Sequence, residues 1–229
     1  MLQKQTVKKE LLELLTKLQA EPELQSCRLV GGTSLALQLA HRKSTDINLF
    51  TVEPFDFDTT FSLLVNNYGL KATRTNQHTI IGFINGIKVD VIHHPFKWLN
   101  PPIIEGDFRL ASINDVAAMK MHAITNSGQR PKDYLDLAFL SSRISYNRIK
   151  ELALEKYPAY DPIMFDKAII YFDDIDRDSI KKIEMLGYEI NWKSIENRLI
   201  RMTEKPNTTF LNPPLKKKEP PKKKRGVNL

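Results

Sequence analysis

The segment from residue 29 to residue 50 constrains the fold of this chain more than any other. An apolar run ends in the pair Gly31-Gly32, a Leu/Ala-rich run follows, and a second strand-like run opens at Asp46. Thr33 and Ser34 are residue types that cap a helix at its start. The segment therefore predicts a strand, a tight turn, a helix and a second strand.

The two glycines have a physical use at such a turn. A side chain there would keep backbone N–H groups away from a phosphate, and the following helix points its positive N-terminus at the same place. The pattern therefore predicts an anion-binding turn made by Gly31, Gly32, Thr33 and Ser34. The alternative is a turn that only joins a strand to a helix, because glycine pairs are common at such joints.

Asp46 and Asn48 stand two residues apart on the second predicted strand. Residues at this spacing project from the same face of a strand, roughly 6.6–6.8 Å apart along the backbone. Their oxygens could therefore converge on one cation beside a phosphate held at the glycine turn.

Two runs, from Gly31 to Leu37 and from Arg42 to Phe50, together resemble the first motif of the AbiEii/AbiGii-type nucleotidyltransferases. This family belongs to the polymerase-β-like superfamily and includes toxins of abortive-infection toxin–antitoxin systems. The chain departs from the motif at Asn48, where the family has a second aspartate. Because hard cations prefer charged oxygens, Asn48 predicts a weakened metal site.

Apolar periodicity predicts helices over residues 6–19 and 59–67. Strands are predicted over residues 70–75, 79–84 and 87–92. The last two strands are separated by Asn85-Gly86, which is typical of a two-residue hairpin turn.

Asp90 is embedded in the last of these strands, between β-branched residues. Burying a carboxylate is costly unless a cation meets it, so Asp90 is a candidate metal ligand; a solvent-exposed sheet face is the alternative. Residues 88–92 also resemble the family's strand that carries a third carboxylate. His93 and His94 face opposite ways on a strand, make a poor chelating pair and are interpreted as structural.

Residues 95–111 are predicted to be an irregular connection that contains a domain boundary. Ser112 and Asp115 then form a capping box that opens a helix. Lys120 lies on an otherwise apolar stripe of this helix, where a lysine often only extends to water. The helix also resembles the family's third motif, whose lysine falls on Lys120.

The next helix is predicted to begin at Pro131, with aspartates in its first turns. Such aspartates commonly interact only with the helix dipole. The run from Arg130 to Leu137, however, resembles the fourth motif of the family, with its key aspartate at Asp133. Further helices are expected from residue 147 to about residue 201.

The resemblance implies an α+β fold, in which a nucleotidyltransferase-like mixed sheet is flanked by helices and followed by a C-terminal helical region. We expect a nucleotidyltransferase core over residues 1–105 and a helical region over 106–205 that completes the site. A basic Pro/Lys-rich disordered tail is expected over 206–229.

The resemblance also implies the role of each site residue. The substrate would be a nucleoside triphosphate, with Mg²⁺ as the metal. The expected catalytic residues are Asp46, Asp90, Lys120 and Asp133; the expected nucleotide-binding residues are Gly31, Gly32, Thr33, Ser34, Arg42 and Lys120; and the expected metal ligands are Asp46, Asn48 and Asp90.

The net charge of +7 is concentrated at one end of the chain. Residues 216–225 contain six lysines and one arginine against one glutamate, so the remainder of the chain is nearly neutral. Such a block can hold RNA or a partner electrostatically, or it can serve only to keep the chain in solution.

No apolar run reaches the ~18–20 residues of a membrane helix, and the N-terminus does not resemble a signal peptide. The single cysteine, Cys27, cannot form an internal disulfide and is interpreted as a buried residue in a reducing cytoplasm. We therefore expect a cytoplasmic protein with no membrane partner.

The expected function is transfer of a nucleoside monophosphate to an RNA, such as tRNA, or to a protein acceptor. The chain would be the toxin of an abortive-infection toxin–antitoxin system, with a cognate antitoxin as a possible partner. The alternative is a catalytically impaired module that binds RNA or a protein, because Asn48 replaces the expected aspartate.

Overall fold

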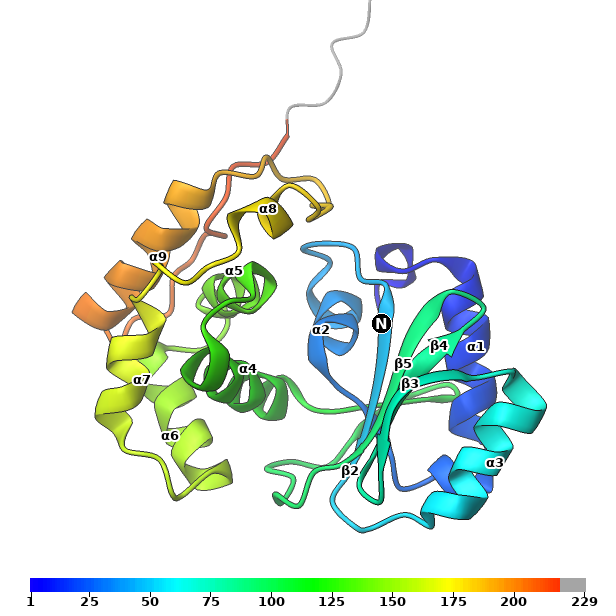
Figure 1. Ribbon diagram of the computed structural model, residues 1–229. Coiled ribbons are helices and arrows are strands. Elements are labelled where there is room, and N and C mark those ends of the chain that lie inside the picture. The colour runs from blue at the N-terminus through cyan, green and yellow to red at the C-terminus, as the bar shows by residue number, and fades with distance from the viewer. Residues whose placement is uncertain (219–229) are drawn as a thin grey trace, which may run out of the picture.

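The computed structural model describes residues 1–218, so the end of the predicted basic tail, residues 219–229, lies outside the described residues. The chain forms two lobes, visible side by side in Figure 1. We call residues 1–111 the sheet lobe and residues 112–218 the helical lobe. The predicted α+β class, with a mixed sheet flanked by helices and a helical C-terminal region, is confirmed.

The sheet has seven strands among the described residues, in the spatial order β3-β4-β5-β2-β1-β7-β6. Two pairs, β2 with β5 and β1 with β7, are parallel, and the other pairs are antiparallel. The strands are β1 (Arg28–Leu29), β2 (Asp46–Thr51), β3 (Lys71–Asn76), β4 (Thr79–Ile84), β5 (Ile87–His93), β6 (Ile103–Glu105) and β7 (Phe108–Leu110).

The predicted strands and the hairpin turn at Asn85-Gly86 are confirmed, and both turn residues have positive φ. The prediction that residues 95–111 are irregular is wrong, because they contain β6 and β7. Each of these strands is three residues long, too short to show an alternating pattern. Since Leu110 pairs with Leu29, the sheet continues past the predicted core boundary at residue 105.

Helices cover both faces of the sheet. In Figure 1, α1 (Lys9–Ala20) and α3 (Phe57–Tyr68) lie on the outer face, and α2 (Gly31–Leu39) lies on the inner face, toward the helical lobe. Short 3-10 turns at Lys4–Thr6 and Pro22–Leu24 flank α1. The leucines of α1 that were predicted to face the core are buried, which confirms the amphipathic pattern.

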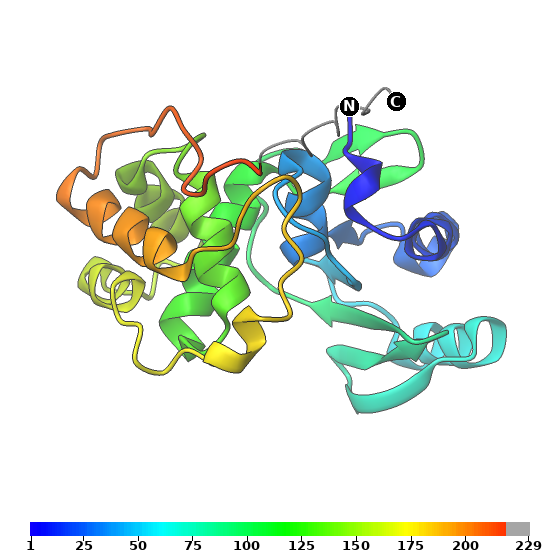
Figure 2. The same ribbon diagram turned by 90° about the horizontal axis from the view of Figure 1, so that it is seen from above.

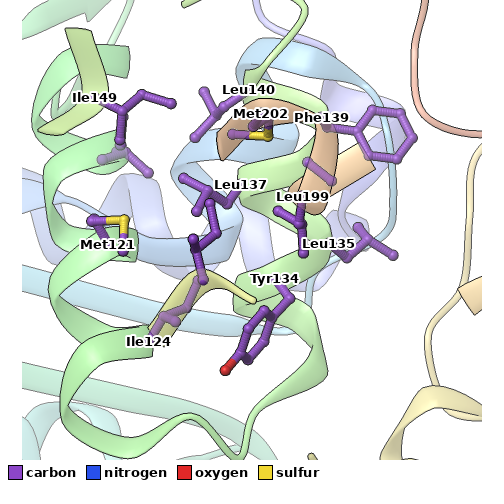
Figure 3. Packing of buried hydrophobic residues seen from close by; sticks show 14 of the residues in the cluster. Met121, Ile124, Tyr134, Leu135, Leu137, Phe139, Leu140, Ile149, Leu199 and Met202 are labelled. Atoms are coloured by element: carbon purple, nitrogen blue, oxygen red, sulfur yellow. The ribbon is translucent and has the colours of Figure 1, made fainter. Parts of the chain in front are cut away.

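The helical lobe contains α4 (Ile113–Ser127), α5 (Pro131–Leu140), α6 (Tyr146–Lys156), α7 (Pro162–Ile169), α8 (Arg177–Ile180) and α9 (Trp192–Glu204), as expected. Its core brings Met121 and Ile124 of α4 against Leu137 of α5 and Leu199 of α9 (Figure 3). Ser112 caps the start of α4 as predicted, since its hydroxyl accepts a hydrogen bond from the N–H of Asp115 at 3.0 Å, and it donates to the Asp115 carboxylate at 2.7 Å. Helices α4 and α5 are therefore fixed in place by a common core.

The prediction that disorder begins at residue 206 is wrong for residues 206–218. Phe210 and Leu215 are buried in the helical core. The backbone N–H of Phe210 donates to the carbonyl of Ser141 at 2.9 Å, and Arg198 donates to the carbonyl of Asn212 at 2.9 Å. Two apolar residues were therefore enough to attach this proline-rich segment to α9.

The segment that follows α8 connects the two lobes. It passes in front of α2 in Figure 2, where the N–H of Lys43 donates to the carbonyl of Glu184 at 2.8 Å. The N–H of Leu186 donates to the carbonyl of His41 at 3.1 Å. Within residues 1–218, none of the helices is both long and apolar enough to cross a bilayer.

Candidate active site

A cavity of about 600 Å³ lies between the sheet lobe and the helical lobe. One wall is formed by β2, β5 and the start of α2, and the opposite wall by α4, α5 and α8. Of the predicted site residues, eight line this cavity: Gly31, Gly32, Arg42, Asp46, Asn48, Asp90, Lys120 and Asp133. Residues from four separate segments of the sequence thus meet at one place.

Four polar side chains form the sheet wall of the cavity. In the parallel pairing of β2 with β5, Asp46 lies beside Lys88 and Asn48 lies beside Asp90. Neighbouring residues of paired strands are ~4.8 Å apart and point to the same face. All four side chains line the cavity. Asp46 and Asn48 therefore share one face of the sheet, as predicted, and Lys88 and Asp90 of β5 share it with them.

The Asp90 carboxylate is buried, which excludes the alternative of a solvent-exposed face. Its Oδ2 atom accepts from the ammonium of Lys88 at 2.8 Å. Its Oδ1 atom is buried and has no hydrogen-bond partner within residues 1–218. Asp90 thus has one oxygen bound to Lys88 and one buried oxygen without a hydrogen-bond donor among the described residues.

The two glycines make room for side chains as well as for backbone. Gly31 has a φ of +68°, and a Cβ there would lie 3.1 Å from the amide nitrogen of Asn48. A Cβ on Gly32 would overlap the guanidinium of Arg42. The glycine pair thus lets β2 and Arg42 approach the start of α2 closely.

Thr33 and Ser34 were predicted to bind nucleotide, but their side chains are fully buried and do not line the cavity. The Thr33 hydroxyl donates to the hydroxyl of Ser44 at 2.8 Å and contacts the carbonyl of Asp46, tying α2 to the start of β2. The backbone amides of Thr33 and Ser34 lie in the first turn of α2. N–H groups in the first turn of a helix have no acceptors within the helix. Ser34 is an exception, because its N–H donates to the carbonyl of Val30.

Asp136 is the centre of a buried charge network that the sequence did not identify as part of the site. Arg42 binds its carboxylate through Nε at 2.7 Å and Nη2 at 2.9 Å, and His41 Nε2 lies 2.8 Å away. Burial would raise the pKa of Asp136, but Arg42 and Lys120 hold it well below its ordinary value. Arg42, predicted to bind nucleotide, lines the cavity but is almost fully buried against this carboxylate.

Lys120 is not extended to water. Its ammonium lies 2.6 Å from Asp133 and 2.7 Å from Asp136, and the residue is only 6% exposed. Burial would lower the pKa of Lys120, but these two carboxylates raise it, so the amine is held protonated. Asp133 also binds Arg130 at 2.7 Å. The two aspartates of α5 therefore orient Lys120, a role beyond that of helix-dipole partners.

Aromatic and apolar side chains line the other end of the cavity. The rings of His122 and Tyr157 stack with centroids 4.0 Å apart, and His94 Nε2 lies 3.0 Å from the Tyr157 hydroxyl. Burial, together with Lys156 and the neighbouring histidines, lowers the pKa of His94 to about 4. Phe50 lies on the same face of β2 as Asp46 and Asn48. The two-residue alternation of this strand was therefore a sequence signal that Phe50 belongs to the site.

The donor set of the sheet wall suits a hard cation such as Mg²⁺. Residues 1–218 contain no group of three His, Cys, Asp or Glu side chains close enough to hold a metal ion. Asp46, Asp90 and the amide oxygen of Asn48 nevertheless provide oxygen donors on one face that lines the cavity. These three residues would hold the ion.

Known proteins match both the sequence and the fold. The model of the family described as nucleotidyl transferase AbiEii toxin, type IV toxin–antitoxin system, matches residues 85–212, a segment that includes Asp90, Lys120 and Asp133 but not the glycine turn. An uncharacterised protein of Aquifex aeolicus is 29% identical over 191 residues, covering 80% of this chain and 92% of that protein.

Two solved structures from Helicobacter pylori share the fold. A candidate nucleotidyltransferase matches with a TM-score of 0.54 and JHP933 with 0.53, each 14% identical over 87% of this chain and covering 92% and 90% of those chains. The family match spans more than half of the chain and contains three of the predicted catalytic positions. The chain belongs to the AbiEii nucleotidyl transferase toxin family.

Proposed function

We propose that this protein transfers a nucleoside monophosphate from a nucleoside triphosphate to an RNA acceptor such as tRNA. The observation that carries this proposal is the meeting of Asp46 and Asp90 with Lys120 in one cavity. Carboxylates on one wall and a fixed ammonium on another provide both charge signs that a metal-bound triphosphate requires.

The chain's own residues would position the triphosphate. Lys120, held protonated by Asp133 and Asp136, offers a fixed positive charge to the phosphates. The free amides at the start of α2 offer further donors. Mg²⁺ held by Asp46, Asn48 and Asp90 would neutralise charge that develops on the phosphate. An acceptor hydroxyl would attack the α-phosphorus and release its proton to solvent, the bond from the α-phosphorus to the oxygen shared with the β-phosphate would break, and pyrophosphate would leave.

The length of the cavity supports a nucleotide as the ligand. Asp46 and Asn48 lie at the polar end of the cavity, and Phe50 lies further along β2, at its aromatic end. The backbone distance from Asp46 to Phe50 along the strand is roughly 13 Å. His122 and Tyr157 lie at this aromatic end. Flat rings there suit a nucleobase, because base–aromatic stacking contributes ~1–3 kcal/mol.

Basic side chains support RNA as the acceptor. Arg130 and Lys132 line the cavity at the start of α5, and the Arg130 side chain is 66% exposed. A protein acceptor is the other outcome of the same experiment. Consistent with the family, the activity would make the chain a toxin, so its expression should arrest growth unless a cognate antitoxin is present.

The test is incubation with each α-labelled nucleoside triphosphate, Mg²⁺ and total tRNA. Wild-type protein is expected to label the RNA, and Lys120→Met and Asp90→Asn should each reduce the rate at least 100-fold. Lys97→Met, which removes an exposed lysine outside the cavity, is the matched control. Label on a protein instead of RNA would change the acceptor; no label on either would overturn the proposal.

A non-catalytic binding module is the second candidate. It is favoured by one observation, which is that Asn48 brings no charge to the sheet wall. This candidate predicts no transfer by wild-type protein or by Asn48→Asp, together with salt-sensitive RNA binding that is lost when the chain ends at residue 218.

A further inference from the structure

The sheet wall of the cavity carries less negative charge than a site for two divalent cations needs. Asp46 and Asp90 contribute two negative charges, Asn48 contributes none, and Lys88 contributes one positive charge. All four side chains line the cavity. The wall therefore has a net charge of −1. This charge neutralises half of the charge of one divalent cation, but only a quarter of the charge of two.

Lys88 is placed to act as a cation of the site. It precedes Asp90 by two residues on β5, so both side chains leave the same face of the strand. Its ammonium lies 2.8 Å from Oδ2 of Asp90, while Oδ1 of the same carboxylate is free within the described chain. The Lys88 side chain is 39% exposed, so its ammonium can also reach a ligand in the cavity.

Asn48 and Lys88 both make the charge of the sheet wall less negative. Asn48 lies beside Asp90 across the β2–β5 pairing, and Lys88 binds Asp90 directly. An ammonium bound to a carboxylate oxygen excludes a divalent cation from that oxygen, because the two positive charges repel at such short range. Lys88 thus occupies one of the two oxygens of Asp90 and reduces the negative charge that Asp90 offers to a metal.

We propose that Lys88 takes the place of a second divalent cation, so that the site holds a single metal ion and Lys88 itself meets the phosphates of the nucleotide. This proposal rests on the proposed function, since it assigns Lys88 a phosphate-binding role in that site. It accounts for Asn48, because a site with an internal ammonium does not need a third carboxylate.

The stoichiometry of Mn²⁺ binding tests this proposal without any transfer reaction. Mn²⁺ is titrated into the protein with a non-hydrolysable nucleoside triphosphate analogue, and bound ion is measured by electron paramagnetic resonance. Wild-type protein is expected to bind one Mn²⁺ per complex of protein, metal and analogue. The Mn²⁺ that the analogue binds in the absence of protein is subtracted from this count. The double variant Asn48→Asp/Lys88→Met is expected to bind two, and Lys88→Met alone should bind its single ion at least tenfold more tightly.

Two variants serve as controls. Lys88→Arg keeps the charge and should retain one ion at an affinity near that of wild type. Lys43→Met removes a lysine that is bound to Glu184 at 2.8 Å outside the cavity, and should change Mn²⁺ affinity less than twofold. Thermal unfolding of each variant establishes that it folds.

Binding of two Mn²⁺ ions by wild-type protein would overturn the proposal, as would a Lys88→Met variant whose Mn²⁺ affinity stays within twofold of wild type. Failure of the proposed function gives a different result. In that case the analogue does not bind in the cavity, and Asp90→Asn leaves Mn²⁺ binding unchanged.

Discussion

Single residues in this site act through the charges that surround them. The role of Asp136 depends on Arg42, from the segment before β2, and on Lys120, from α4. Partners that distant cannot be paired from one sequence. The resemblance identified Lys120 and Asp133, whereas Asp136, Lys88 and His94 required the tertiary contacts.

Asp136→Asn is expected to destabilise the protein by ~3–5 kcal/mol, because it leaves Arg42 and Lys120 buried with less negative charge. Urea unfolding monitored by circular dichroism measures the change. Glu184→Gln is the matched control, since its ion pair with Lys43 is exposed and its loss should leave the free energy of unfolding nearly unchanged. Equal effects of the two variants would contradict the network described above.

His94 is expected to make the protein less stable in acid. Its pKa is about 4 in the folded chain against 6.5 for an unperturbed histidine. Between these values only the unfolded chain binds the proton, so His94 contributes full stability above pH 6.5 and loses it as the pH falls toward 4.

His94→Gln should therefore reduce the slope of unfolding free energy against pH in this window by up to ~1.4 kcal/mol per pH unit. Urea unfolding at several pH values between 4.5 and 7 measures the slope. His78→Gln, at an exposed histidine, is the control. An unchanged slope in His94→Gln would show that His94 is not buried against Tyr157 and Lys156.

At the scale of secondary-structure elements, the sequence predicted the helices and strands that are long enough for their pattern of apolar and polar residues to repeat. Burial alternates over the six residues of β2, which confirms that Asp46 and Asn48 share a face. Residues 87–91 of β5 alternate in sequence between apolar and polar types, so this strand was recognised, but its burial does not alternate. β6 and β7 are three residues each and depend on the pairing of Leu110 with Leu29, a contact between distant segments. Residues 206–218 depend on the burial of Phe210 and Leu215, which composition alone does not indicate.

The junction of α2 with β2 depends on Gly32. Gly32→Ala is expected to destabilise the chain by ~1–3 kcal/mol and to displace Arg42 from Asp136, because the added Cβ overlaps the guanidinium. Gly69→Ala is the comparison, since Gly69 has a φ of +66° but no described atom within 4 Å of an added Cβ. It should lose only the backbone term of ~1 kcal/mol. Thermal unfolding that ranks Gly69→Ala as the more damaging change would refute this assignment.

At the scale of the whole molecule, the site exists only where the two lobes meet. Val30 and Leu35 at the start of α2 belong to the hydrophobic core of the helical lobe, although α2 lies on the sheet. The network of His41 and Arg42 with Asp136 and the backbone contacts of residues 184–186 also join the lobes. The family resemblance predicted both lobes, but the sequence could not show how they are joined.

The two lobes should therefore unfold together. Urea unfolding followed by far-ultraviolet circular dichroism and by fluorescence of Trp98 and Trp192 is expected to give coincident transitions with one midpoint. Trp192 is the first residue of α9, in the helical lobe. A fluorescence midpoint clearly separated from that of circular dichroism would show that the lobes are independent.

The central claim is that the cavity between the lobes binds a metal nucleotide through the β2–β5 wall and Lys120. A crystal structure of the complex with Mn²⁺ and a non-hydrolysable nucleoside triphosphate, with anomalous scattering used to locate manganese, tests it most directly. The account predicts one anomalous peak in contact with both Asp46 and Asp90, and phosphate oxygens within hydrogen-bonding distance of Lys120 and Lys88. A nucleotide bound outside this cavity, or manganese that contacts neither carboxylate, would contradict it.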